Sequence, residues 1–313
     1  MGDLTYEWYR ANRNSFGREK KVLRYTFGVN LPPVLLGTSS FTASGWAGSF
    51  YPKGMRPADY LGFYAEHFQT VEVDSTFYAC PSAQTVQNWA ARTPDNFVFS
   101  VKIPQSITHE KALGDCEVEL AEFLETMDIL GNKLGPIVFQ FPFFNRSAFH
   151  DRHEFLDRLV PFLAKLPDRY KFALEIRNRN WLDSEFANLL RDRKIALVLQ
   201  DRSWMPGPSE LKFDPITADW TYIRWLGDRK AIEERTLTWD KTIVDRTVEL
   251  SSWVDFCYQV IKQGVVIYAY ANNHFGGHAP ATIDRFRDIW QGKGFPDLIR
   301  PQPAHRQSSL FRT

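Results

Sequence analysis

Residues 70–85, "TVEVDSTFYACPSAQT", place two carboxylic acids inside a pattern that is typical of a β-strand. Glu72 and Asp74 alternate with Val71 and Val73 before the strand pattern breaks into a turn containing Ser and Thr. Because side chains alternate between the two faces of a strand, the acids share one face and the valines share the other. We expect the valines to pack against helices and the acids to point into a barrel, near its C-terminal mouth.

Short runs of β-branched or aromatic residues recur along the chain, and most are followed by a segment of helical periodicity such as 56–68, 81–93 or 245–264. Repeated strand–helix units over 313 residues predict an α/β fold, a (β/α)8 TIM-type barrel, with a doubly wound open sheet as the alternative. The eight expected strands are 34–39, 70–74, 97–102, 136–141, 171–177, 195–200, 220–225 and 265–270.

The chain shows no internal repeat and no low-complexity linker. We therefore expect one barrel domain over residues 31–295, preceded by an N-terminal extension of residues 1–30. Residues 296–313 are polar and contain several prolines, which is typical of a short flexible C-terminal tail.

Composition excludes several classes of protein. The net charge is +1, from 38 basic and 37 acidic side chains, so charge alone gives no reason to expect nucleic acid or an anionic membrane as partner. Cys80, Cys116 and Cys257 are widely spaced and form no C-x-x-C pair, which argues against a disulfide framework and a thiolate zinc site. We see neither a signal-peptide pattern nor an apolar run long enough for a membrane span, and expect a cytoplasmic protein.

The alternation that directs Glu72 into the barrel also directs residues of the other strands inward, and most of these are polar. Barrel enzymes carry their catalytic and binding groups at the C-terminal ends of several strands, so these scattered residues define one candidate site. A structural alternative is a buried ion network in which the acids neutralise the basic residues without catalysis. The residues expected on the inward face are Ser100, Lys102, Val138, Gln140, Glu175, Arg177, Tyr222, Arg224, Tyr268, Tyr270 and Asn272.

Five segments carry a resemblance to a known family: "GTSSFTASGWAGSFYPKG", "HFQTVEVDSTFYACPSAQTVQNWAARTPDNFVFSVKIPQSITH", "LGPIVFQFP", "FALEIRNRNWL" and "YANNHFGGHAP". Together they resemble the YecE-like family, domain of unknown function 72, from about residue 34 to 290. The resemblance implies a TIM-type barrel and leaves the activity open. The resemblance also implies which residues of this chain stand at the motif positions of the family. They are Glu72, Ser75, Tyr78, Lys102, His109, Gln140, Pro142, Glu175, Arg177, Trp181, Arg224, Asn272, Asn273 and His278.

The cations Lys102, Arg177 and Arg224 favour an anionic ligand, since the forked arginine donors suit phosphate or carboxylate. Glu72, His109 and Glu175 are the candidate catalytic groups, because each side chain can transfer protons. We therefore predict an enzyme, a hydrolase or lyase, acting on a phosphorylated or other anionic substrate. The substrate-binding candidates are Asp74, Ser75, Tyr78, Lys102, Gln140, Arg177, Trp181, Arg224, Tyr268, Asn272, Asn273 and His278.

Several alternatives remain open from the sequence. Glu72 and Glu175 are also the pair that a glycosidase would need. No cofactor is predicted, although Glu72, Glu175 and a histidine are a suitable ligand set for a single divalent metal. A non-catalytic or nuclease-like barrel would instead bind an anion or nucleic acid, using the backbone of "GGHAP" (276–280) and aromatic and basic groups near the mouth. Those groups are Phe41, Trp46, Tyr78, Arg179, Trp181, Trp204, Trp225 and Arg229.

Overall fold

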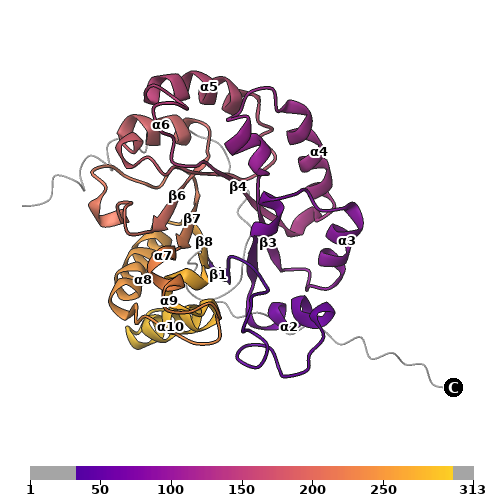
Figure 1. The fold of residues 1–313 in the computed structure, drawn as a ribbon. Coiled ribbons are helices and arrows are strands. Elements are labelled where there is room, and N and C mark those ends of the chain that lie inside the picture. Colours follow the sequence, from indigo (N-terminus) through magenta and orange to yellow (C-terminus); the bar gives the residue numbers. More distant parts are fainter. Residues whose placement is uncertain (1–32, 299–313) are drawn as a thin grey trace, which may run out of the picture. The chain divides into compact units, whose positions relative to one another are not determined.

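The computed structural model describes residues 33–298, which form an eight-stranded parallel barrel surrounded by helices (Figure 1). All eight expected strands are present, with small differences at their ends. The open-sheet alternative is wrong, because the first strand pairs with the last. The strands are β1 (Val34–Thr38), β2 (Thr70–Val73), β3 (Val98–Lys102), β4 (Leu134–Gln140), β5 (Phe172–Glu175), β6 (Ala196–Asp201), β7 (Trp220–Trp225) and β8 (Val266–Ala271).

Several helices begin directly after a residue whose side chain caps the first turn. The side chains of Ser82, Asp151 and Asp183 accept hydrogen bonds from the first-turn amides of α3, α5 and α6. The helices are α2 (Tyr60–His67), α3 (Ala83–Ala91), α4 (Glu117–Asp128), α5 (Arg152–Lys165), α6 (Ser184–Asp192), α7 (Arg229–Glu233), α8 (Thr247–Lys262), α9 (Asn273–Gly276) and α10 (Ala279–Gly292).

The strand–helix alternation is interrupted once. Between β6 and β7, a segment that the structure describes throughout, the chain forms only the 3-10 turn Pro208–Glu210 and no α-helix. Prolines at 206, 208 and 215 explain this, because proline lacks the amide donor that a helix interior needs. An irregular loop therefore follows β6, and its residues line a cavity at the end of that strand.

The barrel interior is filled by alternate residues of the strands, as the strand parity predicts. Val138, Ala173, Val198, Tyr222 and Tyr270 belong to one buried cluster inside the barrel. These apolar and aromatic side chains fill the barrel interior away from the C-terminal strand ends. Polar residues remain at the C-terminal strand ends, where the candidate site lies.

The barrel is closed differently between β1 and β2. Backbone pairing runs from β1 through β8 round to β2, but no regular ladder joins β1 directly to β2 in the described part of the chain. Tyr64 of α2 fills this seam: its hydroxyl accepts from the Thr38 amide at 2.8 Å and donates to the Thr70 carbonyl at 3.1 Å. A Cβ atom on Gly37 would lie 2.0 Å from the Thr70 oxygen, so only glycine permits this approach.

The expected N-terminal extension, residues 1–30, lies outside the described residues, and so does the expected tail beyond residue 298. The barrel packing continues slightly past its expected boundary, since Phe295 stacks on Tyr258 with ring centres 3.8 Å apart and the Pro296 carbonyl accepts from Trp290 Nε1 at 2.7 Å. Within residues 33–298, no helix has the length and apolar character that crossing a membrane requires.

Candidate functional site

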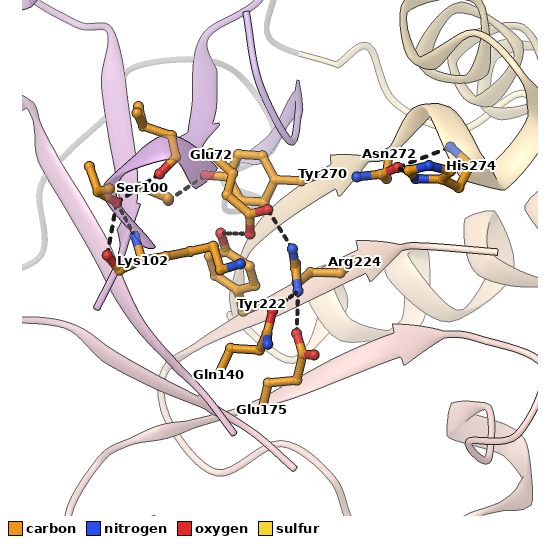
Figure 2. A network of polar contacts seen from close by, with 12 residues as sticks. Glu72, Ser100, Lys102, Gln140, Glu175, Tyr222, Arg224, Tyr270, Asn272 and His274 are labelled. Carbon is orange, nitrogen blue, oxygen red and sulfur yellow. Dashed lines mark hydrogen bonds and ion pairs between the residues drawn. The ribbon is translucent and has the colours of Figure 1, made fainter. Parts of the chain in front are cut away.

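Arg224 of β7 joins acidic side chains from two other strands at the barrel mouth (Figure 2). Its Nη2 donates to Glu72 Oε1 of β2 at 2.8 Å, and its Nη1 donates to Glu175 Oε2 of β5 and lies 3.5 Å from Gln140 Oε1. All four residues are buried, and both glutamates are fully so. Glu72, Glu175 and Arg224 therefore form a buried ion network, which is the structural alternative that the sequence left open.

Glu175 is held as a carboxylate by surrounding arginines. Burial alone would raise its pKa, but Arg224, Arg177 and Arg202 outweigh burial and lower the pKa to about 2. Arg177 also donates from Nε to Glu175 Oε1 at 3.1 Å. A carboxylate with so low a pKa is a weak base, so the geometry favours an electrostatic role for Glu175 over the expected proton transfer.

A layer of tyrosines supports the ion network from inside the barrel. Tyr222 Oη donates to Glu72 Oε2 at 2.7 Å, and the Tyr222 and Tyr270 rings lie 4.9 Å apart. The Tyr270 hydroxyl lies 2.7 Å from Thr70 Oγ1 and 2.5 Å from Ser100 Oγ. Both carboxylate oxygens of Glu72 are therefore engaged, one by Arg224 and one by Tyr222.

Lys102, the last residue of β3, is also buried but is not paired. It is 6% exposed, and its amine has no hydrogen bond and no ion pair among the described residues, only the face of Phe77 at 4.2 Å from the ring centre. Burial and then the charge of Arg224 lower the pKa of Lys102 to about 8, against the opposing effect of Glu72, Glu175 and Asp74. Among residues 33–298 the site thus contains a buried cation without a fixed partner, and the half-buried Arg202 also has no hydrogen bond or ion pair.

The 3-10 turn Asp74–Phe77, which follows β2, positions Lys102. Thr76 Oγ1 accepts from the Lys102 amide at 3.0 Å and lies 2.8 Å from the Lys102 carbonyl, and so ties the end of β3 to the turn. The next residue, Phe77, supplies the ring under the amine.

Asp74 begins the same turn and is partly buried. Burial and then Glu72 raise its pKa to about 6, against Lys102 and Arg224. It is thus a carboxyl group of this site whose protonation changes near neutral pH, which makes it a better proton-transfer group than Glu175.

His109 lies beside this turn. It belongs to the π-helical turn Ser106–Glu110, and its ring centre is 4.9 Å from that of Phe77. Burial, followed by Arg177 and Lys102, lowers the pKa of His109 to about 4. The imidazole is therefore neutral near pH 7, which allows hydrogen bonding and disfavours a role as a cationic acid.

The sequence reasoning missed Gln200 and Arg202, at the end of β6. Gln200 Nε2 donates to the Ile176 carbonyl at 2.8 Å, while its buried Oε1 has no partner among the described residues. Both residues line a cavity of about 290 Å³ at the mouth, together with Met205, Asp228 and Arg246. The parity that identified Arg224 would have identified them, because Gln200 and Arg202 lie two and four residues after the inward-facing Val198 and so share its face.

Some expected site residues lie elsewhere. Tyr268 faces inward, but its hydroxyl accepts from Lys171, which precedes β5, so its polar end lies at the opposite end of that strand from Glu175. This corrects its expected place at the mouth, because it lies one inward step before Tyr270. Trp181 packs on Phe155, with ring centres 5.1 Å apart.

Polar residues after β8 make hydrogen bonds to neighbouring loop segments. Asn272 Oδ1 accepts from the His274 amide and contacts its ring (Figure 2), and Asn273 Oδ1 accepts from Trp46 Nε1 at 3.2 Å. His278 Nδ1 lies 2.7 Å from the Trp239 carbonyl. These contacts explain the three side chains without a ligand.

The glycines of the "GGHAP" segment make backbone hydrogen bonds to the loop after β7 and within the turn that contains α9. The Gly276 carbonyl accepts from the amides of Ile243 and Val244 at 2.7 and 3.1 Å, and the Gly277 amide donates to Asn273. Gly277 has φ +106°, and a Cβ there would lie 2.6 Å from Ile243 Cγ1. The glycines therefore allow the loop after β7 to pack closely against the segment that follows β8.

The expected aromatic groove is only partly present. Trp46 and Trp225 are buried, whereas Tyr78 is 71% and Trp204 45% exposed. Ser75 is also exposed. Arg202 stacks over Trp204, with its guanidinium carbon 4.5 Å from the ring centre. Within residues 33–298, no group of three or more His, Cys, Asp or Glu side chains is arranged to hold a metal ion.

Comparisons with known proteins agree with this architecture. The sequence profile of the family described as "Protein of unknown function DUF72" matches residues 35–307. The UPF0759 protein YecE of Escherichia coli K12 is 36% identical over 115 residues, which are 37% of this chain and 40% of that protein. The UPF0759 protein YunF of Bacillus subtilis is 31% identical over 156 residues, which are 46% of this chain and 52% of that protein. The chain thus spans about half or less of the length of these curated relatives.

Solved structures of the same family have this fold. A DUF72 family protein from Thermotoga maritima aligns with a TM-score of 0.65 at 26% identity, covering 83% of this chain and 98% of that one. One from Enterococcus faecalis aligns with a TM-score of 0.62 at 22% identity, covering 86% and 98%. The match of the family profile over most of the chain shows that the protein belongs to the DUF72 family.

Proposed function

We propose that this protein is an enzyme that binds a small anionic substrate, a phosphate or carboxylate compound, at the C-terminal mouth of the barrel. The observation that carries the proposal is Lys102, a largely buried side chain whose amine has neither a hydrogen bond nor an ion pair among residues 33–298. An unpaired buried charge is costly, and an anionic ligand would remove that cost.

The charges around Lys102 support the same ligand class. Arg224 is already bound to two carboxylates, while Arg177 and Arg202 face the single carboxylate of Glu175. Crowding by these cations lowers the pKa of Arg202 to about 10, after the larger effect of burial. The mouth therefore has basic groups that its own acids leave incompletely neutralised, so a ligand anion would complete the network.

Asp74 and Lys102 supply the groups for catalysis. Their pKa values are shifted toward each other, to about 6 and about 8, so both change protonation near neutral pH. Two groups poised in this way can accept and donate a proton in one reaction cycle, as hydrolase and lyase reactions require.

Thermal unfolding with added ligands tests the proposal. Inorganic phosphate, pyruvate, a nucleoside monophosphate and glucose 6-phosphate are compared, with neutral glucose as the control compound. We expect an anion to raise the melting temperature of the wild type and to have a much smaller effect on Arg177→Ala. Arg193→Ala, an exposed change after α6, should keep the full effect. If no anion stabilises the wild type, the proposed ligand class is wrong.

A second candidate function is the binding of single-stranded nucleic acid. The exposed rings of Tyr78 and Trp204, with Arg202 stacked on the latter, are the observation in its favour, because bases stack on exposed aromatic residues beside basic groups. A short oligothymidine in the same assay separates the candidates. Trp204→Ala should abolish stabilisation by the oligonucleotide and leave that by small anions unchanged.

A further inference from the structure

The surroundings of Lys102 differ from those of a structural lysine in the same protein. Lys133 is also partly buried, but its amine donates to the carbonyls of Ala90 and Thr93 at 2.7 Å each. Lys102 has no such acceptor, and its amine lies against the Phe77 ring. A lysine amine that is desolvated and placed beside another cation is an activated nucleophile, because both effects favour its neutral form.

We propose that Lys102 is a covalent nucleophile that forms an imine with the carbonyl group of the anionic substrate. The inference rests on the proposed function and narrows the substrate class to small aldehydes or ketones that carry a carboxylate or phosphate. The arginines at the mouth, Arg177 and Arg202, would hold the anionic group, while the amine reacts with the carbonyl carbon.

The reaction balances with groups of this site. The neutral amine attacks the carbonyl carbon, a C–N bond forms, and the carbonyl π electrons move to the oxygen; proton transfer from nitrogen to oxygen gives a carbinolamine. A second proton, from Asp74 in its acid form, goes to the hydroxyl, the C–O bond breaks, and water leaves a protonated imine. Asp74 and Lys102 are close enough for each charge to shift the pKa of the other group.

The amine is held at a defined place by its neighbours. Thr76 fixes the Lys102 backbone through both its amide and its carbonyl, and Phe77 packs under the amine. A protonated imine would keep a positive charge at this position, which suits Glu72 and Glu175 nearby because both already favour a cation there. The same carboxylates are held by Arg224, so they stay in place when Lys102 changes its charge.

Reductive labelling of the folded full-length protein tests this without a known substrate. Wild type is treated with formaldehyde or with glyoxylate, each with sodium cyanoborohydride, which transfers hydride to the imine carbon and makes the adduct permanent. Peptide mapping by mass spectrometry then gives the labelling rate at each lysine. Lys53, which is exposed, and Lys133, whose amine is hydrogen-bonded, are the internal references.

At pH 7 we expect Lys102 to react at least about tenfold faster than Lys53, since an amine with a pKa near 8 has on the order of 100-fold more neutral form than an ordinary lysine. The rate should rise with pH to a plateau above about pH 8. Glyoxylate should show a stronger preference for Lys102 than formaldehyde does, and inorganic phosphate should suppress that extra preference by competing for the arginines.

The outcomes separate the two proposals. If Lys102 reacts no faster than Lys53 or Lys133 with either aldehyde, the imine proposal is overturned, and stabilisation by anions in the thermal assay would still support the proposed function. If formaldehyde labels Lys102 rapidly but glyoxylate shows no added preference for Lys102, the proposal that Lys102 is a nucleophile is supported and the proposal of an anionic substrate is wrong. Lys102→Met should lose the fast-labelled peptide and keep the labelling of Lys53.

Discussion

Arg224 and Glu72 are 152 residues apart in the chain, yet their side chains meet at 2.8 Å across the barrel mouth. Because Arg224 also binds Glu175, one guanidinium connects β2, β5 and β7. The fold therefore uses Arg224 as part of its own architecture and leaves Lys102 as a buried cation without a fixed partner among residues 33–298.

Replacing Arg224 should strongly destabilise the protein. Arg224→Ala leaves two buried carboxylates without their shared partner, and we expect a loss of roughly 3–5 kcal/mol in the free energy of unfolding. Urea denaturation measures this loss. The control is Arg229→Ala, which removes an exposed ion pair with Glu233 and should cost no more than about 0.5 kcal/mol. A loss below about 1 kcal/mol for Arg224→Ala would show that the network does not stabilise the fold.

Lys102 should carry a stability cost at neutral pH. Its folded pKa of about 8 lies below the ordinary value near 10.4, so between these values the unfolded chain binds more protons and stability rises with pH. Since one pKa unit corresponds to about 1.4 kcal/mol, we expect Lys102→Met to be about 3 kcal/mol more stable than wild type at pH 7, with the difference shrinking from about pH 8 to 10.4. Urea denaturation at pH 7 and 10 checks this, and a less stable variant at pH 7 would contradict it.

Glu175 should stabilise the folded protein at neutral pH, whereas Lys102 should destabilise it. Its folded pKa of about 2 lies below the ordinary value near 4.3, so the contribution is present above about pH 4.3 and is lost as the pH falls toward 2. We expect a gap of about 2–3 kcal/mol between wild type and Glu175→Gln at pH 6 that narrows below pH 4.3. A gap that is unchanged at pH 2.5 in denaturant titrations would refute this account.

Tyr64 should stabilise the seam between β1 and β2 through its hydroxyl. Tyr64→Phe leaves the buried Thr38 amide without its acceptor, and we expect a loss of about 1–3 kcal/mol. The matched control is Tyr60→Phe in the same helix, a partly exposed tyrosine that stacks on Tyr51 through its ring. Thermal unfolding compares the two variants, and equal effects would show that the Tyr64 hydroxyl does not support the seam.

Much of the site follows from strand parity, which is a local property. Alternation in "TVEVD" places Glu72 and Val73 on opposite faces, and the same rule brings Glu175 and Arg224 to one end of a parallel barrel. A chain with eight such strands separated by helical segments needs little more to specify its fold, and the expected strands are all present.

Local pattern cannot show which charges are paired. Lys102 and Arg224 look alike in the sequence, as inward-facing cations near the ends of their strands, but their surroundings come from different strands and depend on barrel stagger. Arg224 meets two carboxylates, while Lys102 meets a phenyl ring from the turn after β2. Likewise, only the packed structure shows that Gly277 makes room for Ile243. The amino-acid order determined the strands and their faces, and long-range packing decided which polar groups remain unpaired, because desolvation and Coulomb interactions depend on neighbours that are distant in the chain.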